Sequence, residues 1–174
     1  MGRYAVVDAH YWPAGGARAA MLVAADPDFA TVVAEHVAEV SEVRPYRPGR
    51  FADRELPAIR AVLTGTGRVD LLIIDGYVHL DPHGRPGLGA HLHAWLGIPV
   101  IGVAKTRFHT ASHAIEVRRG QARRPLYVTA VGVPATRAAA VVERMTGRYR
   151  IPDALRRVDA LARGRTTGHA RGGG

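Results

Sequence analysis

Two acidic residues close apolar segments of this sequence, and the sole lysine of the chain follows a third. Asp8 ends a run that begins at Arg3, and Asp75 follows the Val, Leu and Ile run of Val69–Ile74. An unpaired carboxylate in such a place is costly, so it is usually paired, hydrogen-bonded or bound to metal. Turn capping or an arginine partner would satisfy each acid alone. The two together, with Lys105 nearby, favour a Mg²⁺ or Mn²⁺ site, because these hard cations prefer oxygen ligands.

Lys105 is the only lysine among 24 Lys and Arg residues, and it follows the apolar run Pro99–Ala104. Lysine is a compact point charge on a slim stem, whereas arginine is a broad planar fork. A single lysine here therefore indicates a narrow site beside a phosphate or a carboxylate cluster. The alternative is an accident of an arginine-rich composition.

The elements around these residues must bring them together. A strand over Val69–Ile74, a helix over Gly87–Leu96 and a strand over Pro99–Ala104 predict a parallel pair joined by a right-handed crossover. Asp75 and Lys105 would then leave neighbouring strands at the same carboxyl edge, where open α/β sheets place their sites.

The remaining pattern is that of a mixed α/β domain. Apolar runs over Arg3–Ala9 and Ala17–Ala24, separated by a turn at 13–16, predict a hairpin. A third strand is expected within Val37–Val43, although Phe29–Val40 could equally be helical. Further expected elements are helices over Ala52–Leu63, Ala135–Met145 and Pro152–Arg163, and a strand over Leu126–Val131. The polar, glycine-ending tail of residues 164–174 is expected to be flexible.

Composition bounds the function. The 174 residues suit one domain, and 47% are apolar. No run reaches the roughly 18 apolar residues of a membrane span, and no signal peptide is evident, so we expect a cytoplasmic protein that does not bind membranes. We also expect a monomer. Without cysteine, any metal must be held by carboxylate or histidine. The formal charge of +9 suggests a nucleic-acid partner, although an arginine-rich composition also raises it.

Several segments resemble the endonuclease V family, in the family's order and at comparable spacing. They are Val7-Asp8-Ala9 with its following tyrosine, Pro45–Gly49 leading to Arg54-Glu55-Leu56-Pro57, Ile74-Asp75-Gly76, and Ile101–Lys105. A weaker match is Tyr149-Arg150-Ile151-Pro152 followed by Arg156 and Asp159. The resemblance implies a ribonuclease H-like fold, a mixed β-sheet flanked by α-helices, in a single domain over residues 1–163.

The resemblance also implies an activity. Such a protein would be a Mg²⁺-dependent endonuclease of DNA repair that recognises deoxyinosine and cuts the second phosphodiester bond on its 3′ side; some members act on inosine in RNA. Asp8 and Asp75 would be metal ligands, and Glu55 would complete the acidic centre directly or through water. Asp159 would take the fourth position, where members show His or Asp. Lys105 would neutralise charge near the scissile phosphate.

Further residues would hold the substrate. Reading one base inside a duplex requires rotating it out of the stack, which costs a few kcal/mol. An aromatic on a proline-stiffened loop suits the vacated space, although Tyr46 could simply pack in its turn. Glycine backbones would let main-chain amides approach the extruded base. The substrate-binding residues implied are Tyr46, Pro48, Gly49, Gly76, Gly102 and Ala104.

The chain departs from the family after Gly76. Val78 stands where members have a second glycine, Asp81 stands where they have histidine, and one residue is added before Gly87. Since this loop helps form the family's base pocket, metal chemistry is better supported than inosine specificity. The same chemistry on inosine-containing RNA or on branched DNA is therefore an alternative. A non-catalytic nucleic-acid-binding module is a further one, which the intact acidic residues and lysine argue against.

A basic segment lies outside these motifs. Arg118–Arg124 contains four arginines and is expected to form a turn between two strands. Such clusters are usually only solvated, but beside a nuclease centre a phosphate contact is an equal alternative.

Overall fold

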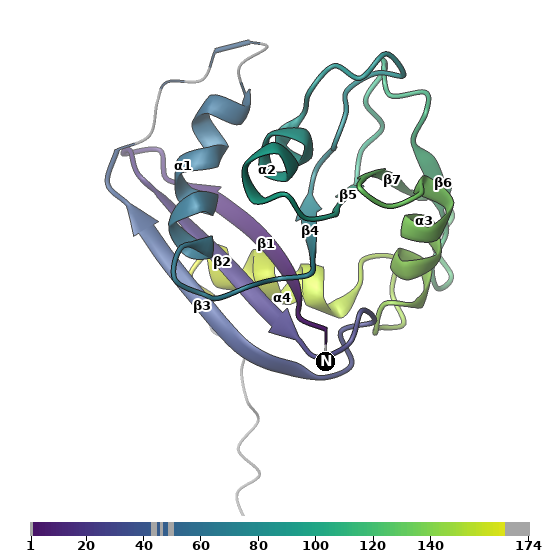
Figure 1. Ribbon diagram of the computed structural model, residues 1–174, viewed down its shortest axis with the longest axis horizontal. Coiled ribbons are helices and arrows are strands. Elements are labelled where there is room, and N and C mark those ends of the chain that lie inside the picture. Colours follow the sequence, from purple (N-terminus) through teal and green to yellow (C-terminus); the bar gives the residue numbers. More distant parts are fainter. Residues whose placement is uncertain (1, 43–44, 46, 49–50, 166–174) are drawn as a thin grey trace, which may run out of the picture.

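The computed structural model describes residues 2–42, 45, 47–48 and 51–165. Figure 1 shows one mixed sheet whose seven strands have the order β3-β2-β1-β4-β5-β7-β6. The strands are β1 (Tyr4–Tyr11), β2 (Ala17–Ala24), β3 (Val32–Val40), β4 (Leu71–Asp75), β5 (Val100–Ala104), β6 (Ile115–Val117) and β7 (Leu126–Val131). The helices are α1 (Phe51–Leu63), α2 (Leu88–Leu96), α3 (Ala135–Arg144) and α4 (Asp153–Ala162).

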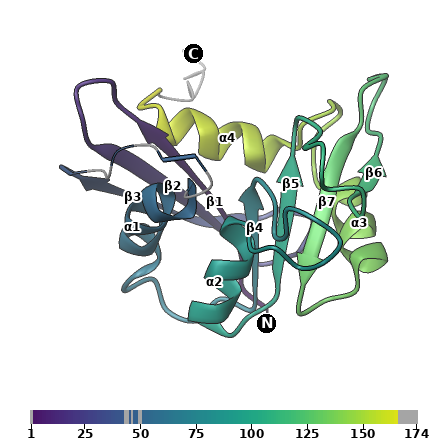
Figure 2. The same cartoon turned by 90° about the horizontal axis from the view of Figure 1, so that it is seen from above.

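Helices cover both faces of the sheet. Buried side chains of α1 and α2 pack with one face of the strands, and those of α3 and α4 pack with the other. Figure 2 shows α4 across one face of β1 and β2, with α1 and α2 on the opposite side. The α/β class, a mixed sheet flanked by helices, is as the sequence predicted.

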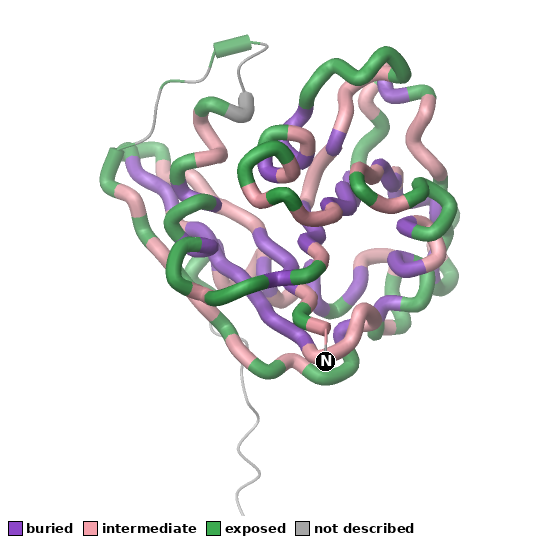
Figure 3. Tube along the Cα trace, viewed as in Figure 1, coloured by how far each residue is buried: buried purple, intermediate pink, exposed green. Residues whose placement is uncertain are grey.

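The central strands are the most buried part of the molecule (Figure 3). Leu72, Ile73 and Ile74 of β4 are fully buried, as are Val100 and Ile101 of β5. Such continuous apolar runs are typical of strands covered on both faces. β1 and β4 are parallel, and so are β4 and β5, so the predicted parallel pair around α2 is confirmed.

The segment before the first helix is a strand. β3 covers Val32–Val40 and pairs with β2 along its length, so the helical alternative for Phe29–Val40 is wrong. The predicted strand within Val37–Val43 begins five residues too late. Ala34 and Ala38 pack toward the core while Val33 and Val37 are half exposed. This period of two is that of a strand, and β2 needs a partner that a helix could not supply.

Two other expectations concern the ends of elements. The basic turn of Arg118–Arg124 does join two antiparallel strands, β6 and β7. Of the tail 164–174, the structure describes only Gly164 and Arg165, so the expected flexibility lies mostly outside the described residues. No helix in the described part of the chain is long and apolar enough to cross a membrane.

Candidate functional site

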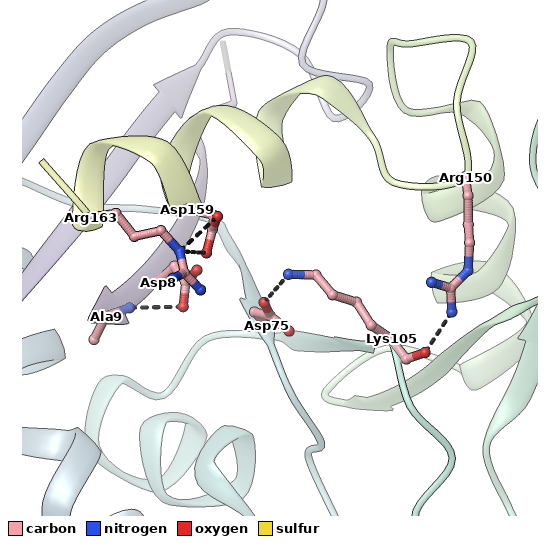
Figure 4. Close-up of polar contacts among 7 residues, drawn as sticks. All are labelled: Asp8, Ala9, Asp75, Lys105, Arg150, Asp159 and Arg163. Carbon is pink, nitrogen blue, oxygen red and sulfur yellow. Dashed lines mark hydrogen bonds and ion pairs between the residues drawn. The ribbon is translucent and has the colours of Figure 1, made fainter. Parts of the chain in front are cut away.

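The register of the sheet places Asp8 beside Asp75. Val7 of β1 pairs with Ile74 of β4, so the next residue of each parallel strand is an aspartate. Both side chains are partly buried. The Asp8 carboxylate accepts a hydrogen bond from the amide of Ala9 at 2.8 Å. Two like charges are therefore held at one strand edge (Figure 4).

Lys105 reaches this edge from the next strand. Asp75 pairs with Val103 of β5, and Lys105 follows two residues later. The Lys105 Nζ lies 2.8 Å from Asp75 Oδ2, with about a third of the lysine side chain exposed. Burial lowers the pKa of Lys105, but the hydrogen bond and charge of Asp75, together with Asp8 and Asp159, outweigh this effect and raise it. Lys105 therefore stays charged at the acidic cluster.

Asp159 reaches the acidic cluster from the helices on one face of the sheet, opposite to α1 and α2. It lies on α4, and Figure 4 shows it above Asp8. Its carboxylate accepts hydrogen bonds from Arg163 Nε at 3.0 and 3.1 Å. The charge of Asp159 also raises the pKa of Asp8, so the two carboxylates interact electrostatically.

Glu55 on α1 completes the acidic cluster. Burial, followed by the charges of Asp8 and Asp75, raises the pKa of Glu55 to about 8, while Arg54 opposes the shift. Burial and the charge of Asp75 likewise raise the pKa of Asp8 to about 7. The fold thus crowds carboxylates that repel one another near neutral pH.

These acidic residues suit a hard divalent cation. In the described ranges, no three His, Asp or Glu side chains form a ready metal-binding group. A Mg²⁺ ion needs no such group, since one or two carboxylates plus water and substrate phosphate usually hold it. The charges of neighbouring carboxylates contribute to the raised pKa values of Asp8 and Glu55, and a nearby positive charge would oppose that contribution. The donor chemistry therefore fits Mg²⁺ or Mn²⁺.

Three residues at this centre were given no role from the sequence, although two of them, Tyr11 and Arg54, lie in the segments that resemble the family. The Arg54 guanidinium carbon lies 4.6 Å from the centroid of the Tyr11 ring. The buried Tyr11 hydroxyl has no hydrogen-bond partner among the described residues. Arg163 holds Asp159. The spacing of Asp159 and Arg163, four residues apart on a helix, was a readable signal for an ion pair. The stacking of Arg54 on Tyr11 joins α1 to β1 and had no local signal.

The glycines expected at the substrate differ in their surroundings. A β-carbon on Gly102 would lie 2.5 Å from the Gly76 carbonyl oxygen and 2.9 Å from the Val78 nitrogen. Gly102 therefore serves the close approach of the protein's own loop. Gly76 has a φ of 139°, and no atom of the described residues lies within 4 Å of where its β-carbon would stand, so the described structure leaves open space there.

The other expected substrate residues are less defined. Ala104 is buried at the end of β5. Pro48 is exposed, and Tyr46 and Gly49 lie outside the described residues. The wedge expected at Tyr46 thus stays a prediction.

Val78, which replaces the family's second glycine, packs in the hydrophobic core. Val78 is fully buried. A β-carbon on Gly89 of α2 would lie 2.7 Å from Val78 Cγ2, so Gly89 leaves the room that this valine fills. The Val78 amide donates to Thr129 Oγ1 at 2.9 Å. The valine side chain therefore points toward α2 and away from the open space at Gly76.

Comparisons with known proteins agree with this geometry. The sequence profile of the family Endonuclease V matches residues 2–131. The Endonuclease V of Azotobacter vinelandii is 34% identical over an alignment of 183 positions, gaps included, that covers 93% of this chain and 82% of that protein.

Solved structures share the fold as well. The crystal structure of Endonuclease V from Streptomyces avermitilis has a TM-score of 0.78 and 32% identity, covering 94% of this chain and 81% of that one. Endonuclease V of Ciona intestinalis, solved with a 23mer DNA containing an inosine followed by a ribo-adenosine, has a TM-score of 0.78 and 18% identity, over 93% of this chain and 84% of that one. The sheet order, the ribonuclease H-like fold and the sequence matches lead to one conclusion: this chain belongs to the Endonuclease V family, a family of nucleases.

Proposed function

We propose that this protein is a Mg²⁺-dependent endonuclease that cleaves a phosphodiester bond 3′ to deoxyinosine in DNA. The observation that carries the proposal is the convergence of Asp8 within β1, Asp75 at the end of β4 and Lys105 just after β5. Family membership supplies the reaction class, and the Ciona intestinalis protein, which shares the fold, was solved with inosine-containing DNA.

The residues divide the work by their chemistry. Asp8 and Asp75 would hold the metal, Glu55 would act directly or through water, and Asp159 would complete the centre from α4. Bound Mg²⁺ supplies Lewis-acid activation of the phosphate and lowers the pKa of a bound water. Lys105 places fixed positive charge where negative charge grows in the transition state.

The ion pair with Asp75 pre-orients the lysine. Lys105 Nζ lies 2.8 Å from Asp75 Oδ2, so the lysine is already held at the acidic cluster. Little reorganisation of its side chain is needed when a phosphate binds. Asp8 and Glu55, with pKa values of about 7 and 8, change protonation in the neutral range. They would lose their protons as positive charge enters the centre.

The substrate side of the proposal rests on the open space at Gly76 and on the loop that carries Tyr46. Because Val78 packs against α2, the departure from the family's glycine leaves that space unfilled. This supports retention of inosine recognition, with Tyr46 as the residue that fills the gap left by the extruded base.

One assay tests the proposal. Matched DNA duplexes carrying inosine, uracil, an abasic site or no lesion are incubated with Mg²⁺ and with EDTA, beside an inosine-containing RNA. We expect cleavage of the inosine duplex with Mg²⁺ only. Preferential cutting of the RNA would show that inosine-containing RNA is the substrate. Cutting in EDTA would show that the reaction does not need a divalent metal.

A further inference from the structure

The segment between α3 and α4 is fixed by a buried arginine. Arg119, at the end of β6, is 5% exposed. In the part of the chain that the structure describes, its guanidinium donates only to backbone carbonyls, with distances of 2.9 Å to those of Gly147 and Tyr149. The carbonyls that accept from Arg119 are those of Glu143, Met145, Gly147, Tyr149 and Arg150. A buried charge needs such compensation, and here it sets the path of residues 143–150.

A second arginine fastens this segment to the candidate active site. Arg150 Nη2 donates to the carbonyl of Lys105 and, at 2.8 Å, to that of Pro125; its Nε donates to the Arg124 carbonyl at 3.1 Å. Figure 4 shows Arg150 reaching the backbone of Lys105. Through Arg150, this segment is therefore hydrogen-bonded to the backbone at the end of β5.

What the fixed segment presents to solvent is an aromatic ring beside two guanidinium groups. Tyr149 is 48% exposed. The guanidinium carbons of Arg148 and Arg156 lie 4.9 and 5.1 Å from its ring centroid. Arg148 Nη2 also donates to the Tyr149 hydroxyl at 2.7 Å. Cation–π contacts of this kind hold side chains that would otherwise be mobile.

The basic turn adds charge to the same place. Gly120 packs against the carbonyl oxygen of Arg148, so the turn Arg118–Arg124 lies against the segment. Arg123 and Arg124 are exposed, and Arg118 is 3.9 Å from Glu116. We call the set Arg118, Arg123, Arg124, Arg148, Tyr149 and Arg156 the arginine surface.

We propose that the arginine surface binds the phosphate backbone of the substrate strand flanking the cleavage site. This inference rests on the proposed function, because the strand is that of the substrate. Planar guanidinium groups match phosphate oxygens in geometry. Arg148 and Arg156 are already ordered on Tyr149, so less side-chain entropy is lost on binding. The hydrogen bond from Arg150 to the Lys105 carbonyl joins the segment that carries this surface to the backbone of the lysine proposed to face the scissile phosphate.

Binding without cleavage tests the inference. In EDTA, fluorescence anisotropy compares a short inosine oligonucleotide with oligonucleotides extended on the 5′ or on the 3′ side, in DNA and in RNA. The Arg148→Gln/Arg156→Gln variant should lose on the order of tenfold in affinity for one extended form and little for the short one. Its slope of log affinity against log salt should fall by about 1.4 to 1.8, for two lost phosphate contacts.

Matched variants separate this role from general charge. Arg60→Gln/Arg68→Gln removes two exposed arginines, one on α1 and one shortly before β4, and should leave the extended and short forms in their wild-type ratio. Tyr149→Phe keeps the ring and should bind nearly as wild type, whereas Tyr149→Leu should lose affinity for the extended form.

The inference would be overturned by equal losses on short and extended oligonucleotides, by an unchanged salt slope, or by the same loss in the control pair. A loss confined to RNA would also overturn it, because DNA and RNA share the phosphate. Since binding is measured without cleavage, failure of inosine cutting would leave this result intact. If the protein cuts inosine-containing DNA but its binding does not depend on the flanking strand, only the proposed role of the arginine surface is contradicted.

Discussion

The two ends of α4 face opposite electrostatic problems. Near its C-terminal end, Asp159 lies above Asp8, among carboxylates whose pKa values are raised by burial and by one another. Before its N-terminal end, the Arg119 guanidinium is buried yet surrounded by carbonyl oxygens. One end holds charge that is not fully compensated by the protein, which favours binding of a cation. The other end uses a charge to fix the backbone. Active centres and scaffolds thus differ in whether the protein itself satisfies its buried charges.

The largest effect is expected when a carboxylate is removed from the acidic cluster near the C-terminal end of α4. Asp75→Asn should lower cleavage by at least about 10³-fold while leaving the fold and most nucleic-acid affinity intact, because basic contacts dominate binding. Turnover, circular dichroism and binding in EDTA are the measurements. The control variant Asp70→Asn, which changes the residue directly before β4, should retain activity. An Asp75→Asn protein that cuts at the wild-type rate would place the centre elsewhere.

The next effect asks whether the shape of the cation matters. Lys105→Arg keeps the charge, but the wider guanidinium cannot occupy the position 2.8 Å from Asp75 without displacing its neighbours. We expect a loss of about 10²-fold in turnover with almost no change in melting temperature. Wild-type turnover in this variant would mean that the single lysine is an accident of composition.

A third change tests the scaffold end. Arg119→Met removes the donor shared by the carbonyls of residues 143–150 and leaves buried acceptors without partners. The free energy of unfolding should fall by about 2 kcal/mol, the typical cost of one such group. Urea denaturation measures this, with Arg118→Met, an exposed neighbour, as control. Equal stabilities of the two variants would show that Arg119 is not a structural support.

The smallest effect concerns pH. The folded pKa values of Asp8 and Glu55, about 7 and 8, lie above their ordinary values of 3.8 and 4.5. Between these limits the folded state binds more protons than the unfolded state, so the free energy of unfolding falls as pH rises. In EDTA, Asp8→Asn should therefore raise the melting temperature above pH 7, by about 3 °C per kcal/mol regained, and should flatten its fall between about pH 4 and 7.

Asp70→Asn serves as the control for this pH series, since Asp70 is exposed and accepts a hydrogen bond from the Arg3 amide. Its melting temperature should follow the wild-type dependence on pH. A wild-type melting temperature that rises from pH 5 to pH 8 in EDTA would contradict the predicted crowding of carboxylates.

The sequence alone determined the features that depend on local pattern. Continuous apolar runs defined β4 and β5, and the strand, helix, strand order placed Asp75 and Lys105 at one edge. Lys105 stood out by composition. The helices α1 to α4 were each expected close to their observed bounds, and Pro152 indicated the start of α4.

Only the tertiary structure decided how distant segments meet. The register of Val7 with Ile74 brought Asp8 beside Asp75, and the need of β2 for a partner made β3 a strand where local pattern was ambiguous. The roles of Arg119 and Arg150 could not be read from the sequence, because their acceptors are backbone carbonyls, which every residue carries. Likewise, Val78 could be judged harmless only once Gly89 was seen to make room for it. Contacts between residues far apart in the chain leave no local signal, so the sequence supplied the reactive groups and the fold supplied their geometry.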